Sequence, residues 1–66
     1  MNLVLNGTPT DLPEGATVAD VLARLELPHR GVAVAVDAEV VPRSAWEQTR
    51  LEDGARIEVV QAVQGG

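Results

Sequence analysis

Apolar residues alternate with small or polar residues in two stretches of this chain, residues 31–36 and residues 55–60. In the first stretch, valines at the even positions alternate with alanines at the odd positions. Because successive side chains of a β-strand point to opposite faces, both stretches predict strands with one buried face. Residues 40–41 add a short apolar pair that Pro42 ends, which predicts a brief additional strand.

The first twelve residues predict a β-hairpin. An apolar run at residues 1–5 is followed by Asn6-Gly7, a dipeptide that favours the positive φ angles of a two-residue hairpin turn. Residues 8–12 then form the returning strand. Because Pro9 cannot donate a hydrogen bond to a neighbouring strand, this returning strand belongs at the edge of the sheet.

Residues 18–25 have helical periodicity instead. Thr17 is a good N-cap and Asp20 stands three residues later, which approximates a capping box. Apolar residues recur at the i, i+3, i+4 and i+7 spacing of one helix face: Val18, Val21, Leu22 and Leu25. Pro28 disfavours helical geometry at the residue before it and is expected to end the helix. So short a helix must pack against the sheet to be stable.

The segment between the last two strands predicts little regular structure. Residues 44–47 have capping-box spacing and predict one helical or 3₁₀ turn, with Trp46 covering the core beside residues 40–41. The acidic pairs Asp37 with Glu39 and Glu52 with Asp53 lie in predicted turns, where solvated carboxylates are the expected state.

This order of elements predicts an α+β fold in a single domain, residues 1–66. The first and last strands can be parallel neighbours at the centre, since the long crossover that a parallel pair needs lies between them. One main helix covers one face of a mixed four- to five-stranded sheet. This is the β-grasp roll.

One face of this sheet is expected to be open. The residues expected to face the helix are Leu3, Leu5, Val32, Val34, Val36, Ile57 and Val59. Their neighbours then form an outward, partly apolar surface, which is a candidate partner-docking surface: Val4, Ala33, Ala35, Glu58 and Val60. An ordinary exposed strand face is the alternative interpretation.

Composition narrows the functional classes. Ten acidic residues against five basic ones give a net charge of −5, which argues against binding nucleic acid or an anionic membrane. The chain has no cysteine, and its single histidine has no second histidine or cysteine with which to bind a metal ion. We therefore expect no metal site, bound cofactor or cysteine nucleophile. A chain of this size has little room for a deep active site. We therefore expect a cytoplasmic monomer that is a partner of enzymes and not itself an enzyme.

The chain ends in Gly65-Gly66. Two glycines contribute nothing to packing and are costly to order, so we expect a flexible tail. Without Cβ atoms the tail is thin enough to enter a narrow cleft and present its terminal carboxylate there. An α-carboxyl group, with an ordinary pKa of ~3.3–3.7, is ionised at pH 7 and is a poor electrophile until it is activated.

Several segments together carry a resemblance to a known family: Leu5-Asn6-Gly7, Gly15-Ala16-Thr17-Val18, Val40-Val41-Pro42-Arg43-Ser44, Leu51-Glu52-Asp53-Gly54, Ile57-Glu58-Val59-Val60 and Gly65-Gly66. In this order, and over essentially the whole chain, they resemble the ThiS sulfur carriers of thiamine-thiazole biosynthesis. That family lies within the ubiquitin-like β-grasp proteins.

The resemblance implies a mechanism. A ThiF-type enzyme would use ATP to adenylate the carboxylate of Gly66, and a sulfur donor protein would replace AMP to give a thiocarboxylate. Thiazole synthase (ThiG) would receive the sulfur. Gly65 would serve as the thin neighbour of the acceptor. Two alternatives stay open: a related carrier for molybdopterin or cysteine synthesis, and a non-catalytic β-grasp binding module.

Overall fold

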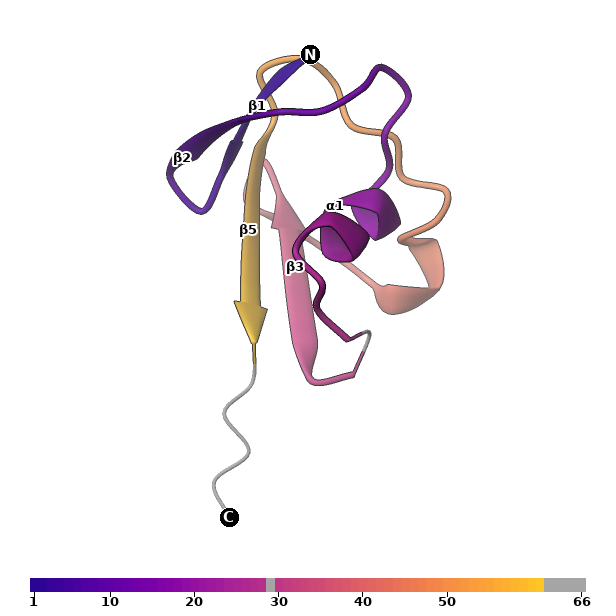
Figure 1. Ribbon diagram of the computed structural model, residues 1–66. Coiled ribbons are helices and arrows are strands. Elements are labelled where there is room, and N and C mark those ends of the chain that lie inside the picture. Colours follow the sequence, from indigo (N-terminus) through magenta and orange to yellow (C-terminus); the bar gives the residue numbers. More distant parts are fainter. Residues whose placement is uncertain (29, 62–66) are drawn as a thin grey trace.

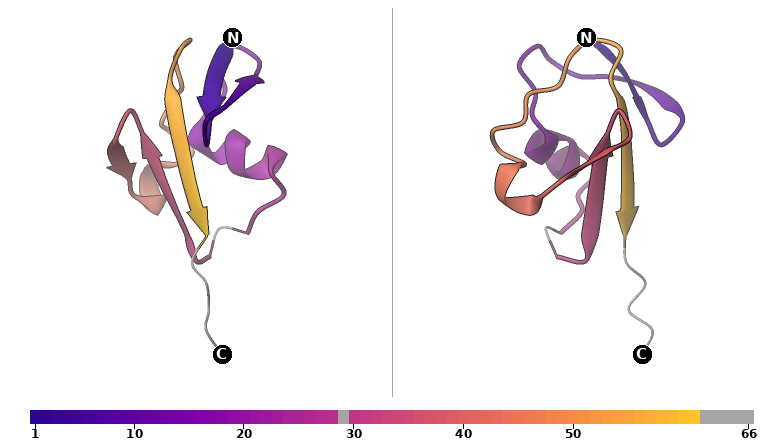
Figure 2. Two further views of the ribbon diagram at one scale, coloured as in Figure 1. Left: turned by 90° about the vertical axis from the view of Figure 1, so that its left-hand side faces the viewer. Right: turned by 180° about the vertical axis from the view of Figure 1, so that it is seen from behind.

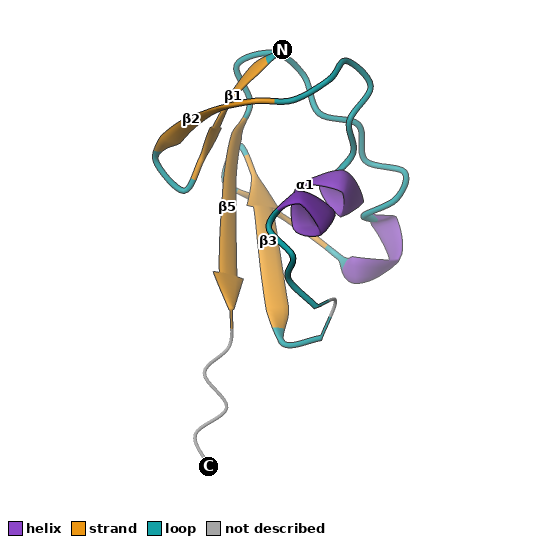
Figure 3. Ribbon diagram, viewed as in Figure 1, coloured by secondary structure: helices purple, strands orange, loops and turns teal. Residues whose placement is uncertain are grey.

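The computed structural model describes residues 1–28 and 30–61, which form five strands, one α-helix and one 3₁₀ turn (Figures 1 and 3). In chain order these elements are β1 (Asn2–Leu5), β2 (Thr8–Asp11), α1 (Val18–Arg24), β3 (Val32–Val36), β4 (Glu39–Val41), η1 (Arg43–Ala45) and β5 (Arg56–Gln61). Gly65 and Gly66 lie outside the described residues.

The strands form one mixed sheet in the order β2-β1-β5-β3-β4. β1 and β5 are parallel neighbours at the centre, and the other pairs are antiparallel. The helix packs on one side of the sheet, while β3 and β5 lie uncovered by it when the molecule is seen from behind (Figure 2). The predicted β-grasp roll, its parallel central pair and the edge position of the strand that contains Pro9 are confirmed.

A two-residue turn joins the strands of each of the two hairpins. Asn6 and Gly7 have φ angles of 49° and 80°, and the register of Leu5 opposite Thr8 leaves only these two residues in the loop. This is the predicted type I′ geometry, in which both central residues have positive φ. Asp37 and Ala38 repeat it between β3 and β4, with φ angles of 49° and 71°.

The start of α1 agrees with the sequence pattern. Thr17 is the N-cap, and its backbone N–H donates to the Asp20 carboxylate at 2.8 Å while the Asp20 N–H donates to the Thr17 hydroxyl at 3.3 Å. The capping box is therefore complete. Val18, Val21 and Leu22 are fully buried, as their spacing predicts.

The predicted end of the helix is wrong. α1 ends at Arg24, before the region that Pro28 restricts, because Glu26 adopts a left-handed φ of 56°. The N–H of Leu27 donates to the carbonyl of Leu22 and the N–H of Glu26 to that of Ala23, both at 3.1 Å. These two bonds are a Schellman motif. Leu25 consequently caps the helix and is 37% exposed instead of lying on the buried face.

The connection between β4 and β5 completes the N-terminus of α1. The N–H of Val18 donates to Thr49 O at 3.1 Å, and that of Ala19 to Trp46 O at 3.2 Å. These are donors that a helix leaves without intrahelical partners. Within the same connection, Pro42 and not Ser44 is the N-cap of η1, and no side chain caps it, so the capping box predicted at residues 44–47 is wrong.

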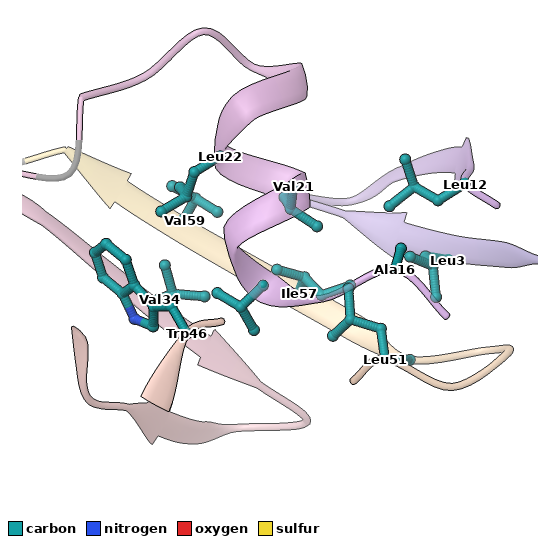
Figure 4. Packing of buried hydrophobic residues seen from close by; sticks show 12 residues of the cluster. Leu3, Leu12, Ala16, Val21, Leu22, Val34, Trp46, Leu51, Ile57 and Val59 are labelled. Atoms are coloured by element: carbon teal, nitrogen blue, oxygen red, sulfur yellow. The ribbon is translucent and has the colours of Figure 1, made fainter. Parts of the chain in front are cut away.

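The core lies between α1 and the inner face of the sheet (Figure 4). Strand residues predicted to face the helix do so: Leu3, Val34, Ile57 and Val59 are buried, and Leu5, Val32 and Val36 pack partly buried against them. Trp46 is buried and its indole N–H donates to Val41 O at 2.8 Å, which confirms its predicted place beside that strand. Connecting segments add Leu12, Ala16, Leu51 and Ala55.

Candidate functional site

β5 is the last described element of the chain, and the C-terminal diglycine follows it in the sequence (Figure 1). β3 pairs with β5 up to its last residue: the register runs from Val36 opposite Ile57 to Val32 opposite Gln61. The last described residue is therefore part of a paired strand at the middle of the sheet. The predicted sulfur acceptor Gly66 and its neighbour Gly65 lie beyond it, outside the described residues.

Four of the five predicted docking residues come together on the outer face of the sheet. Ala33 lies opposite Val60, and Ala35 lies opposite Glu58. Together with Val34 and Val40, they line a shallow hollow of about 210 Å³. We call this surface the outer-face hollow; its side-chain members are Ala33, Ala35, Val40, Glu58 and Val60.

The two valines make the outer-face hollow apolar. Val40 is 76% exposed and Val60 is 64% exposed, and with Leu25 they are the large hydrophobic residues that the described part of the chain leaves exposed. Small alanine side chains between them create the depression. Glu58 is the charged side chain at its border. A complementary partner would therefore present apolar groups with a positive or hydrogen-bonding group near Glu58.

Val4 does not line the outer-face hollow, whereas Val40 does. Val4 lies on the outer face, but it is half-buried between Pro9 of β2 and Arg56 of β5 and does not line the hollow. Val40 lines it because it pairs with Ala35. A two-residue apolar segment shows no alternation, so the sequence did not indicate which of Val40 and Val41 faces outward.

Two of the four acidic turn residues accept hydrogen bonds from the backbone. Asp37 accepts a hydrogen bond from the backbone N–H of Arg56 at 3.0 Å, and Asp53 accepts one from that of Asn2 at 2.8 Å. Both side chains are exposed, as expected of turns, but each also holds the first residue of a strand through its hydrogen bond. Across residues 1–28 and 30–61, no three His, Asp or Glu side chains gather in a way that could hold a metal ion. The one α-helix of that part is too short and polar to cross a membrane.

The fold and this site define a class of protein. The sheet is mixed, its first and last strands are parallel at the centre, one helix covers one face, and the sequence beyond the last strand ends in a diglycine. This combination is the architecture of a ubiquitin-like β-grasp carrier. Comparison with known proteins identifies the family. Residues 3–66 match the sequence model of the ThiS family, and the chain belongs to that family.

Individual relatives agree. The sulfur carrier protein ThiS of Escherichia coli is 32% identical, and the match covers all of both chains. That of Thermus thermophilus is 39% identical over 62 residues, which cover 94% of this chain and 95% of the relative. The crystal structure of the thiamine biosynthesis protein ThiS from Geobacter metallireducens superposes with a TM-score of 0.84 at 32% identity and full coverage of both chains. This family membership makes the protein a sulfur carrier of thiamine biosynthesis.

One relative is a larger protein. A thiazole synthase of Paramagnetospirillum magneticum is 36% identical over 66 residues, and the match covers all of this chain but only 20% of that protein. The present chain therefore spans about a fifth of its length.

Proposed function

We propose that this protein carries sulfur to thiazole synthase as a thiocarboxylate formed at the C-terminus of Gly66. The observation that supports this most directly is the family match, which extends through the diglycine to residue 66. The protein contributes a carrier group and docking surfaces, while its partner enzymes supply the catalytic residues and bind ATP. We place it in the cytoplasm as a monomer that binds neither nucleic acid nor membranes.

The chemistry begins with activation of the carboxylate. A carboxylate oxygen of Gly66 attacks the α-phosphorus of ATP in the active site of a ThiF-type enzyme, and pyrophosphate leaves. Hydrosulfide then attacks the carbonyl carbon of the acyl-adenylate and loses its proton to water. The carbon–oxygen bond to AMP breaks, AMP leaves, and a thiocarboxylate remains. Activation is necessary because an ionised carboxylate resists nucleophilic attack, whereas AMP is a good leaving group.

Docking to the ThiF-type enzyme is assigned to the outer-face hollow. It exposes Val60 near the end of β5, and Val40 on β4, which β3 separates from β5. A partner that covers these valines would be held close to the start of the tail. Burial of exposed valine side chains stabilises a complex by roughly 25 cal/mol for each Å² removed from water, before the costs of association.

Delivery to thiazole synthase is supported by the relative from P. magneticum. A segment similar to the whole of this chain occurs within a protein that is named thiazole synthase. No relative described above is named for molybdopterin or cysteine synthesis, so the thiazole pathway is the better supported of the carrier functions that the sequence left open.

Intact-mass measurement tests the proposal. The protein is incubated with ATP, a ThiF-type enzyme and hydrosulfide as the sulfur source. The expected product is heavier by the difference between one sulfur and one oxygen atom, and the change requires ATP. An unchanged mass, with an enzyme that modifies the E. coli carrier in a parallel reaction, would show that this chain is a binding module instead.

A variant with one alanine added after Gly66 is the matched control. It keeps every residue of the fold, so its thermal unfolding should be unchanged, but its carboxylate is displaced by one residue and acquires a Cβ atom. We expect no thiocarboxylate from it. Sulfur transfer to the extended chain would contradict the assignment of Gly66 as the acceptor.

A further inference from the structure

The parallel pairing of β1 with β5 ends before β5 does. Its register includes only Val4 with Arg56 and Leu5 with Ile57, whereas β5 continues to Gln61. On this side of β5 the chain of β1 turns away at Asn6 into the β2 hairpin. The strand that leads to the tail therefore has a neighbouring strand on one side only after Ile57.

The side chain of Asn6 continues the missing strand. Its carbonyl oxygen Oδ1 accepts a hydrogen bond from the backbone N–H of Val59 at 2.8 Å, and its Nδ2 donates to Val59 O at 3.3 Å. The backbone N–H of Asn6 adds a bond to Ile57 O at 2.9 Å. One residue thus satisfies both backbone groups of Val59 and fixes β5 two residues farther towards the tail than β1 does.

The chemistry of this position requires an amide. Asn6 must tolerate a φ of 49°, accept from an N–H and donate to a carbonyl, and asparagine is suited to all three. Asp37 occupies the equivalent position in the β3–β4 hairpin and has the same φ. It bonds to the beginning of β5, however, where its carboxylate accepts from the Arg56 N–H and its backbone N–H donates to Arg56 O at 2.8 Å. At that position a side chain that only accepts a hydrogen bond is sufficient to hold the strand.

We propose that Asn6 is a positioning residue for the sulfur-transfer reaction: its amide fixes β5 at Val59 and so directs the C-terminal segment towards the partner's active site. The inference rests on the proposed carrier function. Positioning matters because a reacting group that is held less well must be ordered at each turnover, which slows the chemical step without weakening docking elsewhere. Docking through the outer-face hollow does not involve Asn6.

The test compares Asn6→Gly with Asp37→Gly. Both substitutions delete a side chain that bonds to the backbone of β5, and glycine accepts the positive φ at both positions. Adenylation by a ThiF-type enzyme is measured as ATP–pyrophosphate exchange with each carrier. We expect Asn6→Gly to lower kcat about tenfold with an unchanged KM, because only the presentation of the tail is impaired. Asp37→Gly should keep the wild-type kcat.

NMR order parameters of the Val60 and Gln61 amides provide a readout that does not depend on the reaction. They should fall in Asn6→Gly and stay at the wild-type value in Asp37→Gly. Asn6→Asp retains the acceptor but places a second oxygen against Val59 O, so it should be as disordered as Asn6→Gly.

Equal order parameters and equal kcat values in the two glycine variants would overturn the inference. Wild-type order parameters of Val60 and Gln61 in Asn6→Asp would also overturn it. If the wild-type protein supports no pyrophosphate exchange, the proposed function fails. The order parameters alone then decide whether Asn6 fixes the strand.

Discussion

At the scale of single residues, positive φ angles determine which side chains the turns require. Gly7 and Asn6 suit their left-handed conformations, since glycine has no Cβ atom and a short polar side chain can bond locally. Ala38 has a φ of 71° without either advantage. The favoured dipeptide for this turn type is Asp-Gly, and the β3–β4 hairpin has Asp37-Ala38 instead. Ala38 therefore stores strain in an exposed turn.

Ala38→Gly should stabilise the protein. Removing the Cβ relieves about 1–2 kcal/mol of left-handed strain, and the greater freedom of glycine in the unfolded chain offsets part of it, which leaves a gain of about 0.5–1 kcal/mol. Denaturant titration of both chains measures the difference in the free energy of unfolding. Ala33→Gly makes the same chemical change in the middle of β3, where φ is ordinary, and should destabilise. A loss of stability in Ala38→Gly would refute the assigned strain.

At the scale of elements, α1 is short because both of its ends are built by tertiary and capping contacts. The capping box at Thr17 and the carbonyls of the β4–β5 connection satisfy its first N–H groups. At the other end, the Schellman motif places Leu27 against the core beside Leu22. The residue that must be left-handed in this motif is Glu26, where glycine is the usual choice.

Glu26→Gly should therefore raise the free energy of unfolding by about 0.5–1 kcal/mol, for the same balance of relieved strain and added chain entropy. Ala23→Gly is the control at an exposed position within α1, and it should cost about 1 kcal/mol because glycine is a poor residue in a helix interior. The midpoints of thermal and denaturant unfolding should therefore rise in Glu26→Gly and fall in Ala23→Gly. If both variants were less stable than the wild type, the Glu26 side chain would stabilise the fold by more than its left-handed strain costs.

At the scale of the whole molecule, the two faces of the sheet separate the hydrophobic core from the proposed docking surface. The inner face carries the core beneath α1 (Figure 4). The outer face carries the exposed hollow, which residues of β3, β4 and β5 line. Substitutions on the outer face can consequently change partner binding while the core is retained.

Val60→Glu should weaken docking to the ThiF-type enzyme. It replaces an exposed apolar side chain in the hollow with a carboxylate beside Glu58, which the partner would have to desolvate. We expect KM for the carrier to rise about tenfold, equivalent to 1.4 kcal/mol. Thr8→Glu introduces the same charge on exposed edge strand β2 and should leave KM unchanged. Equal KM values for the two variants, with the fold intact by circular dichroism, would exclude the outer-face hollow as the docking surface.

Patterns along the chain were sufficient for much of the fold. Alternation assigned the inner and outer faces of β3 and β5, and Asn6-Gly7 specified its turn, because these features depend on neighbouring residues only. The helix end was mispredicted because Pro28 is a strong local signal, whereas the Schellman motif depends on a non-glycine residue in a left-handed conformation. For the candidate site, the sequence predicted four of the residues that line the hollow, while Val4 lies on the outer face outside it and Val40 was not among the predicted residues.

By itself the sequence determined the β-grasp class, the family and the diglycine end, since hydrophobic period, turn dipeptides and ordered motifs are properties of the chain. Only the tertiary structure decided that Val40 joins Val60 on the outer face and that Asn6 bonds to Val59, a residue 53 positions away. The physical reason is register. A partner across the sheet is selected by the alignment of strands that meet only after the chain has folded, and no local pattern contains that alignment.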